Sequence, residues 1–391
     1  MIGTTTSIRR ALTASALGAG ISYGNLAVAL PLVVLAEGRT AFVAGVLLGL
    51  NTIAFSLGAL LALPLRRAET GIALGLATIA AGDVVLVVSS ANGWLAAGAL
   101  AHGTGMGLFW VGVQAALGRR SGITGSQRSF VDQYAVYTFA SATGGALTGG
   151  GIALLRALGA GDATSIRLTF AGGAAAALVG IPPVTAWLRT VGAQALARSR
   201  PAPLQGLALQ LPDLLLVSAM GMLLNLAPVV LDQDFGFAPL SIGIVAGLIA
   251  AAKIAGSFTA GRVALTTGSR KAVGAMLAAS ALAAAVLAGT QQAWLYVLLT
   301  LAATFFGIGV WPIVVDGALA RVSPPQRSSL TIAWNAREYA AIAATTVLGG
   351  YLLDASARPT LLLALAAALL AAAAVSALTV LRRPVYGART T

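Results

Sequence analysis

The sequence contains no cysteine and only one histidine among its 391 residues. Without cysteine the chain can form neither a disulfide nor a thiolate metal ligand. A single histidine also excludes a metal site built from several histidines. The sequence therefore indicates no metal and no cofactor, and it offers no cluster of catalytic side chains for an intramembrane enzyme.

Charged residues are scarce as well. They make up 9% of the chain, against 58% for hydrophobic residues, whereas a soluble globular domain carries roughly 25% charged residues. This composition predicts an all-α, polytopic membrane protein. The phosphate-binding pattern G-x-x-x-x-G-K-[ST] is missing too, so this chain does not itself use ATP.

Twelve apolar runs are long enough to cross a bilayer as helices, which takes roughly 20 residues each. Most connections between them are only a few residues long, which leaves no room for a soluble domain. The first run continues to about Ala36, too far for a signal peptide, and is predicted to be an uncleaved span. The predicted spans are 10–36, 41–65, 71–90, 94–118, 128–155, 167–189, 210–231, 238–261, 271–289, 292–318, 328–353 and 359–381.

Lysine and arginine are unevenly distributed between the two sides of these spans. With the N-terminus inside, 18 of the 24 basic residues fall in cytoplasmic segments and 4 fall outside, while Lys253 and Arg337 lie within spans. Cytoplasmic loops are enriched in basic residues, so both termini are predicted to be cytoplasmic. The net charge of +13 is then a topology signal, and no nucleic-acid partner is expected.

The chain also repeats itself. Four tripeptides recur in the same order at offsets of 199 to 202 residues, which indicates a duplicated six-helix unit with both copies in the same orientation. The pairs are NLA at 25–27 and 225–227, VAG at 43–45 and 245–247, GMG and GIG at 105–107 and 307–309, and QRS at 127–129 and 326–328.

Four short stretches contain glycine at suggestive spacing, and the first and last of them also contain arginine: GALLALPLRR at 58–67, AHGTGMG at 101–107, GALTGG at 145–150 and GRVALTTGSRK at 261–271. With the twelve spans, the parallel halves and the basic central loop, they resemble the major facilitator superfamily of transporters over essentially the whole chain. The resemblance implies six-helix bundles at 1–189 and 210–391, joined by a cytoplasmic loop at 190–209. It also implies a monomer in the cell membrane, with lipid, protons and a small-molecule substrate as partners.

The family's loop signature is only partly kept. Ala62 and Leu265 stand where the family has aspartate in each half, which removes the acid from its charge relay. The GALTGG stretch is similar to a motif of drug/proton antiporters, and it is equally typical of close helix packing. The predicted cytoplasmic gate or loop residues are Gly58, Arg66, Arg67, Asp132, Gly261, Gly268, Arg270 and Asp316.

Two adjacent charges, Arg337 and Glu338, lie in the middle of the eleventh predicted span. A charge at this depth costs about 2.5–3.5 kcal/mol and is a functional candidate by default. Helical spacing places Glu338 with Trp334 and Asn335 on a polar stripe, and Arg337 on a packed alanine face. Glu338 is therefore predicted to bind the coupling proton, with Arg337 or Lys253 as charge partner, unless the charges only lock helices together. The alternatives for Lys253 are that it receives an anionic substrate or snorkels to the interface.

Asp83 and His102 form a second candidate site for a coupling proton. Asp83 lies nine residues before Asn92 in the turn between spans three and four, and His102 lies ten residues after it. Antiparallel helices would hold the two side chains at nearly equal depth, where such a pair can exchange a proton. The alternative is that Asp83 only makes hydrogen bonds within its bundle.

The remaining polar residues are given simpler roles. Asp213, like Asp132, falls in the first turn of a predicted span and is interpreted as a gate or cap residue. The residues expected to line a central cavity are Asn25, Trp110, Gln114, Tyr134, Tyr137, Asn225, Trp311, Trp334 and Asn335.

The sequence thus favours a secondary transporter, not an enzyme, that works by alternating access. Proton-coupled export of an amphiphilic or drug-like compound is the first hypothesis. Uptake of a small organic anion with protons is the alternative, and a transporter-like sensor is the third.

We predict that a reporter fused after Thr391 is active only when it functions in the cytoplasm, because of the 18-to-4 distribution of basic residues. A pair of fusions, one to a reporter that needs the cytoplasm and one to a reporter that needs the exterior, measures this directly. Activity of the exterior reporter alone would refute the topology.

Overall fold

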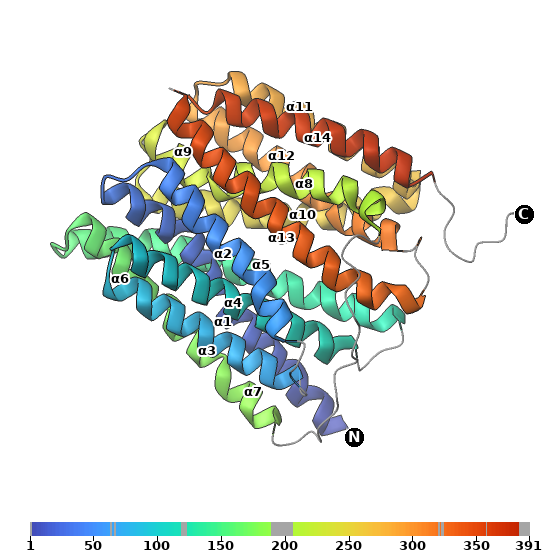
Figure 1. The fold of residues 1–391 in the computed structure, drawn as a ribbon, viewed down its shortest axis with the longest axis horizontal. Coiled ribbons are helices and arrows are strands. Elements are labelled where there is room, and N and C mark those ends of the chain that lie inside the picture. Colours follow the sequence, from blue (N-terminus) through green and yellow to red (C-terminus); the bar gives the residue numbers. More distant parts are fainter. Residues whose placement is uncertain are drawn as a thin grey trace, which may run out of the picture. The chain divides into compact units, whose positions relative to one another are not determined.

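The computed structural model describes residues 2–62, 65, 68–118, 123–188, 206–319, 321, 324–356 and 358–382. Side chains are described except at 2–9, 68, 114–115, 117–118, 123–133, 188, 319 and 324–332. Every regular element in this part of the chain is an α-helix (Figure 1). The helices are α1 (Ile2–Ala36), α2 (Ala41–Leu61), α3 (Ala68–Val88), α4 (Asn92–Gly118), α5 (Ile123–Ala157), α6 (Asp162–Val179), α7 (Ile181–Leu188), α8 (Leu207–Asn225), α9 (Ala227–Gln233), α10 (Pro239–Thr267), α11 (Ser269–Gly289), α12 (Ala293–Leu319), α13 (Pro324–Ala355) and α14 (Thr360–Val380).

Each predicted span coincides with a helix or with two consecutive helices, so the helical prediction is confirmed. The sixth predicted span divides into α6 and α7 at Gly180, just before Pro182 and Pro183, and the seventh divides into α8 and α9 just before Pro228. Proline has no N–H to donate to the preceding turn, so a helix is interrupted there.

Nine of the helical segments are long and apolar enough to cross a membrane by length and composition. Helices α4, α5 and α13 are not among them, because glycine, threonine and polar aromatic residues dilute their apolar runs. The membrane character of the chain is clear, while the full set of twelve spans stays a prediction.

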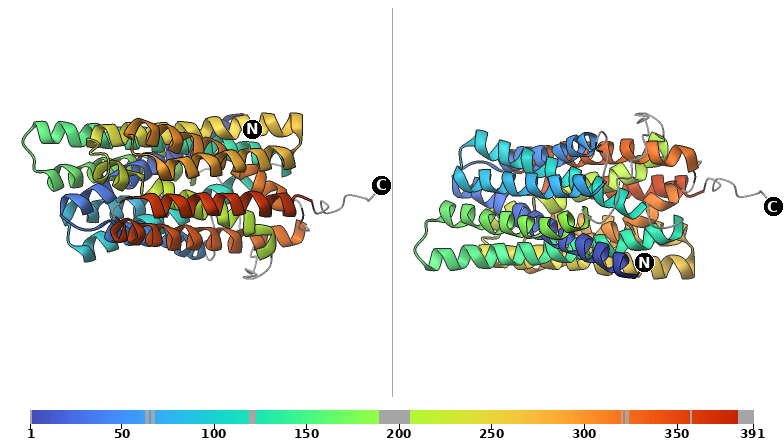
Figure 2. Two further views of the ribbon diagram at one scale, coloured as in Figure 1. Left: turned by 90° about the horizontal axis from the view of Figure 1, so that it is seen from above. Right: turned by 90° about the horizontal axis from the view of Figure 1, so that it is seen from below.

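The chain divides by its internal contacts into two compact units. Unit 1 comprises residues 1–198 and 231–250, and unit 2 comprises residues 199–230 and 251–391. In unit 1, α1 packs against α5 and α6, and α3 packs against α4 and α6. In unit 2, α8 packs in the same way against α13 and α14, and α11 against α12 and α14. The packing pattern supports the internal repeat, and Figure 2 shows the same helices from two further directions.

The repeat extends to single contacts between helices. A Cβ atom added to Gly103 of α4 would meet the backbone oxygen of Asn51 and lie 3.0 Å from Cβ of Ala54 in α2. At an offset of 202 residues, a Cβ atom on Gly256 of α10 would meet the backbone oxygen of Phe305 in α12. Small residues let both pairs of helices approach at the same position of each copy.

The glycine run of α5 is also used for close packing. An added Cβ atom would meet the backbone of Ile21 in α1 at Gly144, and would lie 2.5 Å from the backbone oxygen of Pro239 in α10 at Gly149. These contacts lie within unit 1. They support the helix-packing interpretation of the GALTGG stretch.

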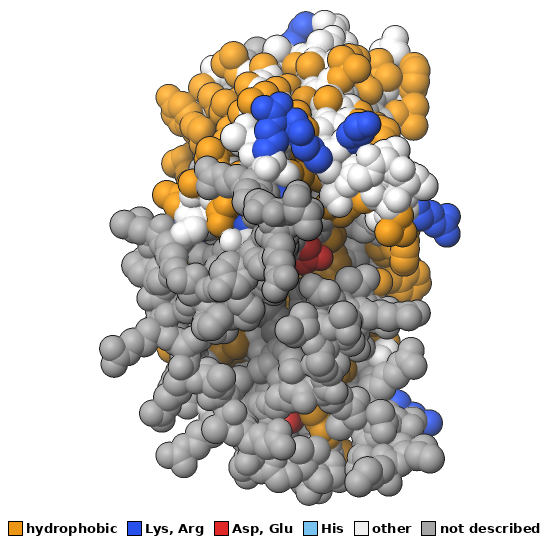
Figure 3. Space-filling model, turned by 90° about the vertical axis from the view of Figure 1, so that its right-hand side faces the viewer, with side chains coloured by type: hydrophobic (Ala, Val, Ile, Leu, Met, Phe, Trp, Pro, Cys, Tyr) orange, Lys and Arg blue, Asp and Glu red, His pale blue; other side chains and the backbone are white. Residues whose placement is uncertain are grey.

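Large apolar side chains cover much of the outer face of the helices. Phe139, Leu158 and Leu265 are exposed by 62%, 75% and 88%. Figure 3 shows one face of the molecule, on which most of the described side chains are hydrophobic and Lys and Arg gather in a few places. Such a surface is stable against lipid tails rather than water.

We predict that Gly58→Ala lowers the stability of the detergent-solubilised protein by about 1–3 kcal/mol, because the added methyl group would meet the backbone of Thr104 in α4. The matched control is Gly172→Ala in α6, where an added Cβ atom has no neighbour within 4 Å. Thermal unfolding and folded yield measure both variants. Equal unfolding temperatures for the two would contradict the packing argument.

Candidate functional site

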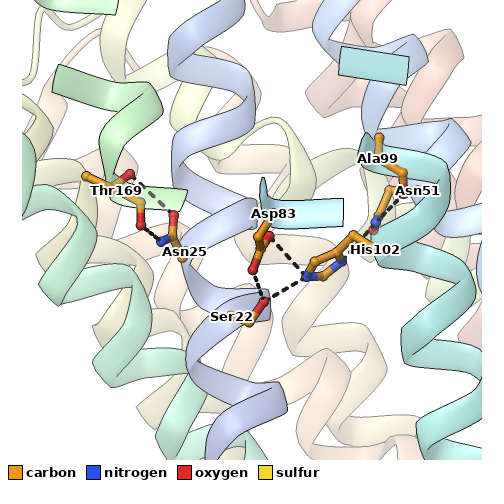
Figure 4. Close-up of polar contacts among 7 residues, drawn as sticks. All are labelled: Ser22, Asn25, Asn51, Asp83, Ala99, His102 and Thr169. Atoms are coloured by element: carbon orange, nitrogen blue, oxygen red, sulfur yellow. Dashed lines mark hydrogen bonds and ion pairs between the residues drawn. The ribbon is translucent and has the colours of Figure 1, made fainter. Parts of the chain in front are cut away.

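A cluster of polar side chains lies inside unit 1, where α1, α2, α3 and α4 meet (Figure 4). It consists of Ser22, Asn51, Asp83 and His102. Three of these residues have no exposed surface, and Asn51 is 3% exposed. A polar group buried so deeply is stable only when it is hydrogen-bonded, so each contact in the cluster has a large energetic consequence.

Asp83 and His102 lie together as predicted. Oδ1 of Asp83 is 4.0 Å from Nε2 of His102. The two helices can approach because Gly82 precedes Asp83: a Cβ atom there would lie 2.6 Å from the backbone nitrogen of His102. The matched depth across the turn between α3 and α4 is therefore confirmed.

Ser22 of α1 connects the two residues. Its hydroxyl donates to Oδ2 of Asp83 at 2.6 Å, and the same oxygen lies 3.1 Å from Nε2 of His102. A hydroxyl has one hydrogen to donate. Because that hydrogen is used on Asp83, the N–H at Nε2 of His102 must donate to Ser22.

Asn51 of α2 holds the other side of the imidazole. Its Nδ2 group donates to Nδ1 of His102 at 3.1 Å and to the backbone oxygen of Ala99 at 3.0 Å. Nδ1 therefore accepts, which agrees with the proton on Nε2. The four side chains form one directed chain of hydrogen bonds, from Asn51 through His102 and Ser22 to Asp83.

Asp83, at the end of this series of hydrogen bonds, has one carboxyl oxygen without a hydrogen-bond partner among the described residues. This oxygen is Oδ1. Gly173 of α6 covers the carboxyl group, since a Cβ atom there would lie 2.7 Å from Oδ2. An ionised carboxylate in such surroundings is costly, and binding a proton removes the cost.

Other cavity candidates of unit 1 lie on α1, α4 and α5. Nδ2 of Asn25 donates to the backbone oxygen of Thr169 in α6 at 2.5 Å. The ring centroids of Trp110 and Tyr137 are 5.0 Å apart, and those of Trp110 and Tyr134 are 6.1 Å apart. Tyr23 joins this aromatic cluster, with its centroid 5.9 Å from that of Tyr137.

A second polar cluster lies in unit 2 around Asp213 of α8. Its Oδ1 accepts the indole N–H of Trp311 at 2.8 Å, and its Oδ2 accepts that of Trp334 at 2.5 Å. Nε2 of Gln210 donates to the backbone oxygen of Trp334 at 2.8 Å. The interpretation of Asp213 as a helix cap is wrong: it is fully buried, seven residues into α8, and binds side chains of α12 and α13.

The two faces predicted for α13 are only partly confirmed. Glu338 and Trp334 are buried, whereas Arg337 and Ala341 are half-buried and Ala344 is exposed. The packed face is thus the one that carries Glu338, because Trp334 turns inward to bind Asp213. The prediction that Arg337 faces a packed alanine surface is confirmed only at Ala333, which is buried.

The charged and amide candidates of unit 2 have different partners. Nε of Arg337 donates to the backbone oxygen of Ala333 at 3.0 Å. Lys253 is half-buried and makes no ion pair with any described residue. Nδ2 of Asn225 donates to the hydroxyl of Thr346 at 3.0 Å, and Asn335 is half-buried.

The predicted gate residues fall into three groups. Gly58 is buried against α4, and the exposed ones are Gly261, Gly268, Arg270 and Asp316. Arg66 and Arg67 lie outside the described residues, as do the side chains of Asp132 and Gln114.

Sequence reasoning missed Ser22, Asn51 and Gln210 as members of these clusters. One signal was present: Asn51 is the repeat counterpart of Lys253, so the first copy carries an amide where the second carries a cation. No pattern marks Ser22, because serine is common in membrane helices and its partner residues lie 61 and 80 positions away.

No protein-family model matches the sequence, and no characterised protein matches it by sequence similarity. Solved structures are nevertheless similar over almost the whole chain. A bacterial homolog of the human lysosomal transporter Spinster, in an inward-facing and occupied conformation, has a TM-score of 0.69 at 15% identity over 97% of this chain and 94% of that chain.

Two further solved structures are similar to this chain to about the same degree. A variant of the nucleoside transporter NupG has a TM-score of 0.70 at 11% identity, over 95% of this chain and 98% of that chain. A POT family transporter bound to a thioalcohol-conjugated peptide has a TM-score of 0.70 at 11% identity, over 93% and 94%. All three are membrane transporters with the major facilitator fold, which is the fold of this chain.

We predict that Ser22→Ala lowers the stability of the solubilised protein by about 1–3 kcal/mol, because it leaves Oδ2 of Asp83 and Nε2 of His102 without their shared partner. The matched control is Ser376→Ala in α14, whose hydroxyl bonds only Ala373 in its own helix. Thermal unfolding measures both. Equal losses would mean that the Ser22 bridge contributes nothing particular.

Proposed function

We propose that this chain, which has the fold of the major facilitator transporters, is a secondary transporter in the cell membrane that exports a small amphiphilic or drug-like compound in exchange for protons. The observation that carries the proposal is the buried network of Asp83, Ser22 and His102. A network of ionisable groups deep among apolar helices is the kind of feature that binds a proton in transporters.

The proton step follows from the directions of the hydrogen bonds. A proton arriving at Nδ1 of His102 lets the imidazole release its Nε2 proton to the oxygen of Ser22. Ser22 passes its own hydrogen to Oδ2 of Asp83. The result is a neutral carboxylic acid, a neutral imidazole protonated on Nδ1, and a hydroxyl that has reversed its direction. Asn51 then turns its amide so that its oxygen accepts from Nδ1.

Coupling to transport requires that this network is accessible to water in one state of the transporter and to the substrate pathway in another. Loss of the negative charge on Asp83 removes the cost of holding it among apolar helices, which favours one arrangement of the bundle over another. Alternating access of this kind needs no ATP.

The substrate proposal rests on the aromatic cluster of Tyr23, Trp110, Tyr134 and Tyr137. Aromatic faces bind apolar and planar groups, and also cations. The alternative, uptake of a small organic anion with protons, is favoured by Lys253, which is half-buried and has no ion pair among the described residues. Transport in liposomes of cationic, neutral and anionic compounds discriminates between them, and no transport at all would favour a sensor.

We predict that Asp83→Asn abolishes substrate accumulation driven by a pH gradient but keeps substrate exchange across the membrane, because asparagine retains the shape and cannot bind the proton. His102→Gln should have the same effect. The matched control is Glu37→Gln, an exposed acid that should change nothing. The measurement is flux into proteoliposomes with and without the gradient.

Retained exchange shows that the variants are folded and bind substrate. If Asp83→Asn still accumulates substrate against a gradient as the parent does, the network is a structural element and does not carry the coupling proton.

A further inference from the structure

Two carboxyl groups lie near each other in unit 2, where sequence reasoning expected an acid beside a cation. The indole of Trp334 in α13 binds Asp213 of α8, and Glu338 lies four residues, about one helical turn, after Trp334 on the same buried face of α13. Both side chains are buried, with Asp213 at 0% and Glu338 at 9% exposure. The pair belongs neither to the network of unit 1 nor to its proton step.

The two acids have very different hydrogen bonds. Asp213 accepts one indole N–H on each oxygen, from Trp311 and Trp334. Donors aimed at both oxygens stabilise a carboxylate in its ionised form. The indole groups have no acceptor function, so they cannot serve a protonated Asp213 equally well.

Glu338 has no such support. Its carboxyl group makes no hydrogen bond with any described residue, although a small part of the side chain stays accessible. A second negative charge here would be buried, unpaired and beside the charge of Asp213. Like-charged carboxyl groups in one buried site cannot both ionise, and one of them retains a proton.

The surrounding charged and titratable groups are few. Helix α8 packs against α12, α13 and α14. Its own ionisable residue is Asp213, and α14 has none. The others on these helices are Tyr296 and Asp316 of α12 and Arg327, Arg337, Tyr339, Tyr351 and Asp354 of α13. Lys253 of α10 makes no ion pair among the described residues, so it does not neutralise the acids.

We propose that Asp213 and Glu338 form a second proton-binding site, in which the indoles keep Asp213 ionised and Glu338 holds a single proton for the pair. The site is independent of the transport proposal, because it concerns the binding of a proton by the purified protein. It gives each copy of the repeat its own proton site, at different positions and built from different residues.

The test uses the full-length protein in detergent, with ¹³C in the side-chain carboxyl of glutamate. The chain has three glutamates, Glu37, Glu69 and Glu338. At neutral pH the infrared spectrum should contain a carboxylic-acid C=O band that shifts with the label. This band should disappear in Glu338→Gln and persist in the matched control Glu37→Gln.

The variant Asp213→Asn tests whether Glu338 interacts with Asp213 or is a lone buried acid. Without the neighbouring negative charge, Glu338 should lose its proton at a lower pH than in the parent. A labelled band that is absent at neutral pH in the parent overturns the proposal. So does a titration midpoint that Asp213→Asn leaves unchanged or raises.

A second measurement covers the case in which Asp213→Asn does not fold. When Glu338 of the parent loses its proton at high pH, the new charge lies beside the indole groups that bind Asp213. The ultraviolet Raman signal of the indole N–H should therefore change at the same midpoint as the infrared band, and this change should be missing in Glu338→Gln. Indole signals that do not follow the band contradict the pair. Because neither readout depends on transport, failure here leaves the transport proposal intact, and failure of transport leaves the pair intact.

Discussion

A polar group that is kept away from water has to find its partner inside the protein. In a chain with so few charges, this requirement determines most of the architecture. It makes the backbone helical, because only a helix satisfies its own N–H and C=O groups within one segment. It also explains why Ser22 lies against Asp83 and why two indole groups from different helices point at Asp213. Asp83 and Asp213 are each a point at which side chains of three or four helices are held together.

Small residues make these meetings possible. Gly82 brings the backbone of α3 next to His102, and Gly173 leaves room above Asp83. Larger residues at these positions would push the helices apart by about the width of a methyl group, which is enough to break a hydrogen bond of normal length. The many glycines of the chain are therefore part of the polar sites as well as of the packing.

The sequence predicted the helices well, because long apolar runs and the requirement of crossing a bilayer leave little choice. It also predicted that Asp83 and His102 meet, since two antiparallel helices joined by a short turn must place equidistant residues side by side. Glu338 was harder. Helical spacing says which residues of α13 share a face with Glu338, but not which residue of another helix that face meets.

Asp213 shows the same limit. Its distance from the start of the helix resembled that of a cap residue, yet its partners Trp311 and Trp334 lie 98 and 121 positions further along the chain. Contacts at such separations depend on how helices rotate about their axes, and periodicity in one helix carries no information about that rotation. In the structure Trp334 turns inward, while Ala341 is half-buried and Ala344 is exposed on the face of Arg337.

The hydroxyl of Ser22 has one hydrogen, so the network of unit 1 has only two self-consistent orientations. When it reverses, the amide of Asn51 turns as well, and the backbone oxygen of Ala99 loses the donor that it has in this structure. Asn51 is also the residue whose backbone lies against Gly103, at a close contact between α2 and α4. In the proposed proton step, the protonation state of Asp83 on α3 is thereby linked, through the non-titrating side chain of Asn51, to the contact between α2 and α4.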